Sequence, residues 1–313
     1  MAFTFRPAIR DNVSLLIGLA GSSGSGKTYT AMRLASGMMS DARPFAVIDT
    51  EAGRAKHYAD QFRFDHGDLR PPFEPRAYAD AIAAADAAGY PVIVVDSCSH
   101  EHAGEGGILD MQEAEFARLG GRDAVKMLSW VKPKGEHRRM MSRLLQIRAH
   151  LILCFRAEEK IEMVRGKDGG MEVRKKVTPT GLDGWVPICE KTLPYELTAS
   201  FLLMASRPGV PLPIKLQEQH RALFPLDQPI TEDSGRRLAE WARGGTTSVP
   251  APTTPPLTER AEIVATIKSL SSRIPVDDKR TAARTYLGEA TLETADLAAL
   301  SDLLAWCRTR AAA

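Results

Sequence analysis

Long apolar segments are missing from this sequence of 313 residues, and none approaches the roughly 20 residues that a membrane-spanning helix needs. The first residues, MAFTFRPAIRDN, also lack the apolar segment of a secretion signal. We therefore expect no membrane contact and a cytoplasmic location.

Cysteine is scarce as well. The four cysteines form no CxxC pair and show no regular spacing: Cys98, Cys154, Cys189 and Cys307. A disulfide framework and a structural zinc site are therefore not expected. His100-Glu101-His102 offers two imidazoles and one carboxylate without a further ligand nearby, so it does not predict a metal site either.

A large excess of one charge is also absent. The formal net charge of +2 is too small to indicate nucleic-acid binding by itself. What is present, 44% hydrophobic and 26% charged residues, is ordinary for a soluble globular protein. The length suits one substantial domain and a smaller one.

Alternating apolar and helical segments fill the first part of the chain. Buried strands are predicted at residues 14–20, 45–50, 92–96 and 151–155, and helices at residues 27–39 and 74–88. Strands that alternate with helices indicate an α/β fold, with a mostly parallel sheet flanked by helices. Beyond residue 155 we expect a glycine-rich hairpin at residues 160–177, strands at 196–204 and 212–216, and a helix at 233–243.

A proline- and threonine-rich segment at residues 244–257 predicts a flexible linker between a core at 1–243 and a small helical module at 258–313. Helices are expected there at about residues 258–273, 278–286 and 291–308. The module has eight basic and eight acidic residues. We therefore expect it to dock on a protein rather than on DNA.

One motif carries clear chemistry. Gly21-Ser22-Ser23-Gly24-Ser25-Gly26-Lys27-Thr28 matches GxxxxGK[ST] between a predicted strand and a predicted helix. Backbone N–H groups of such a loop surround the phosphates of ATP at the positive end of a helix. Lys27 is expected to reach the β- and γ-phosphates, and the Thr28 hydroxyl to bind Mg²⁺.

A second motif completes the metal site. Val92-Ile93-Val94-Val95-Asp96 is a buried strand that ends in a carboxylate, about 70 residues after the loop. In P-loop enzymes such an aspartate holds the magnesium ion, directly or through water. The two motifs together predict a Mg·ATP site.

Four further segments resemble the RecA-like recombination ATPases: IDTEAGR at residues 48–54, VVDS at 94–97, CFRAEEK at 154–160 and PYEL at 194–197. The chain is most similar to a phage-encoded family, the Sak-four group, whose members include single-strand annealing proteins. The resemblance covers about residues 15–242 and is looser at 101–146. It implies a RecA-like P-loop NTPase core, a homo-oligomer in a ring or filament, single-stranded DNA as a partner, and a phage or prophage protein in the bacterial cytosol.

The resemblance also implies roles for three residues. Glu51 matches the glutamate that activates the attacking water, and Tyr58 stands at the offset of an aromatic residue that stacks on adenine. Arg156 follows a buried strand where the family places a sensor of the γ-phosphate. Alternatively, Arg156 or Lys160 would act in the nucleotide site of a neighbouring subunit. A further alternative without a role in catalysis is a surface salt bridge from Arg156 to Glu158 or Glu159.

A basic stretch lies where the family places a DNA-binding loop. Residues 118–148 hold nine basic and two acidic residues, a local charge of +7. Pro133 and Gly135 favour a loop there, and Lys132, Lys134, Arg138 and Arg139 are candidate DNA contacts. A solvated helix face is the alternative. The hairpin adds Arg165 and Lys167 as candidates.

The expected function is an ATP-dependent DNA recombination protein that hydrolyses Mg·ATP and pairs or anneals single strands. The alternative is a switch or loader whose ATP state controls docking on a replication or recombination partner. A metabolic kinase is less consistent with the sequence, because no motif for an acceptor substrate is present.

Overall fold

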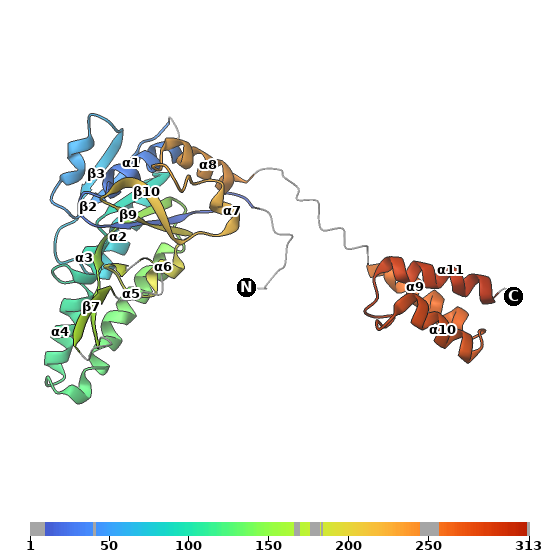
Figure 1. Cartoon of the computed structure of the whole chain (residues 1–313). Coiled ribbons are helices and arrows are strands. Elements are labelled where there is room, and N and C mark those ends of the chain that lie inside the picture. Colours follow the sequence, from blue (N-terminus) through green and yellow to red (C-terminus); the bar gives the residue numbers. More distant parts are fainter. Residues whose placement is uncertain are drawn as a thin grey trace. The chain divides into compact units, whose positions relative to one another are not determined.

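The computed structural model describes residues 10–39, 42–165, 170–175, 182, 184–244 and 257–311. It divides into two compact units, Met1–Gly245 and Thr246–Ala313 (Figure 1). The predicted linker lies outside the described residues except at its two ends.

The first unit is built on a sheet of eight strands: β1 (Leu16–Gly21), β2 (Phe45–Asp49), β3 (Phe64–Asp68), β4 (Val92–Asp96), β5 (His150–Glu159), β8 (Trp185–Pro187), β9 (Ala199–Met204) and β10 (Arg207–Lys215). The strand order is β10-β9-β1-β5-β4-β2-β3, and β8 pairs with the end of β5. Neighbouring strands are parallel, except that β10 and β8 run antiparallel to their partners.

The helices of this unit are α1 (Lys27–Met38), α2 (Pro75–Ala87), α3 (Ser99–Ala103), α4 (Ile108–Arg118), α5 (Val131–Leu144), α6 (Leu193–Glu196), α7 (Glu218–Arg221) and α8 (Glu232–Arg243), and both faces of the sheet are covered. Residues of α1 and α8 join one apolar core, and residues of α2 and α5 join the core on the opposite face. Strands β2 and β4 are buried at every position, which explains their continuous apolar sequences. The predicted α/β class with a mostly parallel sheet is confirmed.

Short elements connect these larger ones: the 3₁₀ helices η1 (Arg54–Tyr58), η2 (Asp123–Val125) and η3 (Leu128–Trp130), and a separate two-stranded ribbon of β6 (Ile161–Arg165) and β7 (Met171–Lys175). The hairpin was expected from its glycines. Strand β3 was not, because FDHGD has no apolar alternation and forms a strand only by pairing with β2 at the sheet edge.

The prediction of a loop around Lys132 and Arg139 is wrong, because these residues lie in helix α5. Pro133 is the third residue of the helix, in the first turn, where a backbone N–H has no intrahelical acceptor. Gly135 costs about 1 kcal/mol relative to alanine. Burial of His137 and of three apolar side chains farther along α5 outweighs that cost.

The second unit contains α9 (Leu257–Ser271), α10 (Val276–Leu287) and α11 (Leu297–Ala311). Ile267, Ala282, Leu300 and Leu304 are buried in a core of its own. Among the described residues, no helix is both long and apolar enough to cross a bilayer.

We expect that a chain ending at Gly244 will fold and bind nucleotide. Helix α8 is complete at Arg243, and the apolar core of the first unit contains no residue beyond Ala242. The melting temperature of the truncated chain should lie within a few degrees of the corresponding transition of the full chain. As a control, a chain ending at Ile230 loses α8 and should not fold. An insoluble chain ending at Gly244, or one with a much lower melting temperature, would contradict the division into two units.

Candidate nucleotide-binding site

The pairing of the central strands brings the predicted site residues to one edge of the sheet. In the register of β1, β5, β4 and β2, Gly21 pairs with Arg156, Cys154 with Asp96, and Asp96 with Asp49. The phosphate-binding loop, the candidate metal ligand and the segment around Glu51 therefore meet at the carboxyl ends of parallel strands. This is where open α/β sheets bind ligands.

The loop Gly21–Gly26 turns from β1 into α1 with Gly24 and Gly26 in the left-handed region, at φ of 76° and 80°. Other residues adopt this conformation only at a cost. The buried Ser25 hydroxyl donates to the Ser22 carbonyl at 2.8 Å, which fixes the turn. Helix α1 begins directly after Gly26, so its free N–H groups and positive dipole end face the loop.

Lys27 lies against this loop. Its Nζ donates to the Ser22 carbonyl at 2.8 Å. Burial lowers the pKa of Lys27, although the nearby Asp96 and Glu51 act in the opposite direction. Within the described residues this half-buried ammonium group is bonded to one carbonyl oxygen, so it would bind a phosphate strongly.

Thr28 and Asp96 form the candidate metal site. The Thr28 hydroxyl donates to Asp96 Oδ2 at 2.5 Å, which brings two oxygen ligands together. Burial raises the pKa of Asp96 to about 6, although the hydrogen bond from Thr28 acts to lower this pKa. The pair fits Mg²⁺, since that ion prefers oxygen ligands and its charge would stabilise a buried carboxylate.

Asp49 positions Glu51 at the end of β2. The buried Asp49 carboxylate accepts hydrogen bonds from the Glu51 N–H at 2.6 Å and the Ala55 N–H at 3.0 Å. The chain therefore turns sharply after β2. The Glu51 side chain is 15% exposed and lies near Lys27 and Asp96, as the effects on their pKa values show.

Arg156 contacts Glu51 directly, with Nη2 and Nε donating to Oε1 at 2.7 and 3.1 Å. The alternative of a salt bridge from Arg156 to Glu158 or Glu159 is wrong. Glu158 pairs with Lys160, and Glu159 with Lys175. The sequence does not predict the contact with Glu51, because 105 residues separate the partners.

This contact affects the protonation of Glu51. Burial alone would raise the pKa of Glu51, but the hydrogen bonds and charges of Arg156 and Arg54 outweigh it and lower the pKa. Glu51 is therefore a carboxylate at neutral pH. It is a weaker proton acceptor while it is bound to Arg156 than after Arg156 has moved away.

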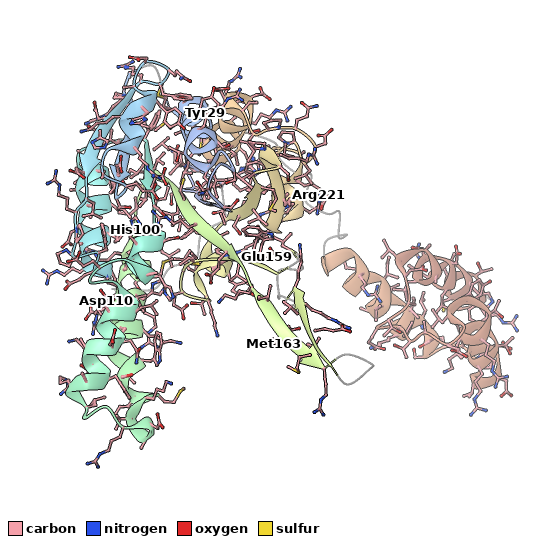
Figure 2. The ribbon with its side chains drawn as sticks, turned by 60° about the vertical axis from the view of Figure 1, so that its left-hand side comes forward. Tyr29, His100, Asp110, Glu159, Met163 and Arg221 are labelled. Atoms are coloured by element: carbon pink, nitrogen blue, oxygen red, sulfur yellow. The ribbon has the colours of Figure 1, made fainter. Side chains whose placement is uncertain are left out.

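Tyr58 lies at the end of η1 in a group of aromatic side chains beside α1. Its ring centroid is 5.9 Å from that of Tyr29 and 6.5 Å from that of Phe62. Tyr29 directly follows Thr28 and is 40% exposed (Figure 2). The pattern of α1 did not single out Tyr29, yet it is a second candidate for stacking on the base.

The candidate DNA contacts lie on the solvent side of α5, which buries Pro133, His137, Met140, Met141 and Leu144. Lys134 pairs with Glu190 at 3.6 Å, and Arg139 pairs with Glu136. Within the described chain, Lys132 and Arg138 have no ion-pair partner. Arg143 and Arg148 are held by aspartates of α2, so the charge available for a ligand is smaller than the local sum of +7.

The two remaining candidates are Arg165 and Lys167, from the predicted hairpin. Arg165 is exposed at the end of β6, and Lys167 lies outside the described residues. No group of three metal-ligating side chains occurs in the part of the chain that the structure describes. His100 instead contacts the Thr50 hydroxyl through Nδ1 at 2.8 Å.

A family model described as an AAA domain matches residues 14–186, more than half of the chain. The chain belongs to this AAA domain family. The matched segment includes the phosphate-binding loop, Glu51, Asp96, α5 and Arg156, so the family model and the geometry agree on a P-loop, ATPase-type domain. No curated protein matches the chain. The likeness to phage recombinases stays a prediction from the sequence.

Proposed function

We propose that the protein is an oligomeric, RecA-like ATPase that binds Mg·ATP and holds single-stranded DNA for annealing or strand pairing. The observation that carries this proposal is the exposed basic side of α5, on a helix that is physically joined to the nucleotide site. A complete nucleotide site alone would fit many activities.

The joining contact is a buried pair. Helix α3 begins three residues after Asp96, and its Glu101 contacts His137 of α5, with His137 Nδ1 and Glu101 Oε1 2.9 Å apart. Both side chains are nearly inaccessible to solvent. A shift of the segment after β4 on nucleotide binding would therefore move α5 and its basic side.

Hydrolysis would use the residues at the sheet edge. Lys27 and the loop N–H groups would bind the phosphates, and Thr28 and Asp96 would hold Mg²⁺, which would supply positive charge next to the phosphates. Arg156 moves from Glu51 to the γ-phosphate. The released Glu51 carboxylate accepts a proton from the attacking water.

The second candidate function is an ATP-dependent switch or loader. Two observations favour it: several basic residues of the 118–148 segment are ion-paired, and the C-terminal helices form a unit with its own core. In this alternative the C-terminal unit docks on a protein such as a single-strand binding protein.

A salt titration tests the DNA contact. Replacing Lys132, Lys134, Arg138 and Arg139 with alanine should weaken binding to single-stranded DNA while ATP affinity is kept. Each lost phosphate contact lowers the slope of log K against log salt by about 0.7, so the slope should fall by about 3 if all four contribute. Replacing only the unpaired Lys132 and Arg138 should account for about 1.4 of this.

The matched control replaces Arg143 and Arg148, which are held by Asp80 and Asp86. This control should leave the slope unchanged. An unchanged slope in the fourfold variant would mean that the basic side of α5 is only a solvated surface.

A further inference from the structure

The β6–β7 ribbon has an apolar face that no other part of the described chain covers. Directly paired residues share a face, and the register pairs Ile161 with Lys175, Met163 with Val173, and Arg165 with Met171. The four large apolar side chains of this face are 59–65% exposed. A two-stranded ribbon with a bare apolar face is marginally stable in water, so we expect a partner to cover it.

The charges on this face all have one sign. Arg165 and Lys175 lie at its two ends, where Lys175 is ion-paired with Glu159 of β5, and the acidic residues of the ribbon, Glu162 and Glu172, are on the opposite face. Glu172 is paired there with Arg174. A complementary surface would therefore be apolar opposite the middle of this face and acidic opposite Arg165.

The same chain carries such a surface. A groove of about 510 Å³ runs along α4 and the segment after it, with Leu109 and Phe116 as its large apolar residues. Asp110, Glu113 and Asp123 make it acidic, and Lys126 is its one basic residue. Next to Lys126 in the chain, Met127 is 82% exposed and Leu128 is 54% exposed.

The two surfaces do not meet within one chain. Figure 2 shows Met163 on the ribbon and Asp110 on α4 well apart, on two projections that extend from the same end of the core.

We propose that the apolar face of the β6–β7 ribbon docks in the α4 groove of a second copy of this chain. The contact joins different surfaces of the two copies, so it leaves a free ribbon and a free groove and can continue into a ring or filament. It rests on the oligomer of the proposed function and identifies the surfaces that would build it.

A mixed disulfide tests the contact. One full-length variant carries Met163→Cys and the other carries Leu109→Cys, and the two have tags of different mass. Both also carry Cys189→Ser, because Cys189 is partly exposed whereas Cys98, Cys154 and Cys307 are buried. After mixing and mild oxidation, the main covalent product should be a dimer with one copy of each tag. The matched control pairs Met163→Cys with Tyr195→Cys, whose side chain is 61% exposed outside the groove.

The control mixture should give little mixed dimer. Equal cross-linking in both mixtures, no mixed dimer in either, or a dominant Met163→Cys self-dimer would each overturn the proposal. A dominant self-dimer would indicate ribbon-to-ribbon pairing.

A second measurement separates this contact from DNA binding. The double variant Met163→Gln and Val173→Gln, which removes apolar surface without changing the charge beside Arg165, should raise the dissociation constant of self-association about tenfold or more, measured by sedimentation without nucleotide or DNA. Binding of single-stranded DNA to dilute, monomeric protein should be unchanged. If that binding falls instead, the face contacts DNA and the proposal is overturned. If the mixed disulfide forms but the protein does not bind DNA, the proposed function is refuted and the proposed interface is still supported.

Discussion

Replacing Lys27 with alanine is expected to weaken ATP binding by about 100-fold or more. The Nζ of Lys27 lies on the phosphate-binding loop, where it is partly buried and donates to the Ser22 carbonyl. A hydrogen bond from a charged donor contributes about 1.5–3 kcal/mol, and Lys27 would contact more than one phosphate oxygen. Calorimetric titration with Mg·ATP measures the effect.

The matched control for this variant is Lys191→Ala, an exposed lysine outside the phosphate-binding loop. Its ATP affinity should equal that of the unchanged protein. An unaltered melting temperature of the Lys27→Ala variant would show that the loop remains folded. ATP affinity that survives the loss of Lys27 would contradict the assignment of this loop.

Replacing Glu51 with glutamine should keep ATP binding but lower turnover by about 10²–10⁴-fold. A neutral amide cannot accept a proton from the attacking water, and general base catalysis has this magnitude. The amide can still accept a hydrogen bond from Arg156, so the local structure should be kept. Steady-state release of phosphate and calorimetric ATP titration, measured on the same sample, separate the two effects.

Glu158→Gln is the control for the Glu51 variant, because Glu158 lies two residues beyond Arg156 on β5 and pairs with Lys160. It should hydrolyse ATP at the normal rate. Normal hydrolysis by the Glu51→Gln variant would show that another group activates the water.

The residues in contiguous motifs could be located from the sequence. Gly21–Thr28 and Asp96 follow from the chemistry of a short loop and of a strand end, and the parallel sheet follows from continuous apolar strands such as β4. In these cases the structure that the local sequence favours is also the structure that these residues adopt in the folded protein.

Contacts between distant segments could not be predicted in this way. The Arg156–Glu51 pair depends on the position of β5 between β1 and β4. The acidic partners of Arg143 and Arg148 come from α2. The helical state of the segment around Pro133 is decided by the packing of His137, Met140 and Leu144 rather than by local propensity.

The most direct test of the account is the rate of Mg-dependent ATP hydrolysis with and without single-stranded DNA. We expect a measurable basal rate that single-stranded DNA increases. The increase should be lost when Lys132, Lys134, Arg138 and Arg139 are replaced together, although the basal rate is kept. A rate that single-stranded DNA leaves unchanged, and that only a protein partner increases, would contradict the recombination function and favour the loader.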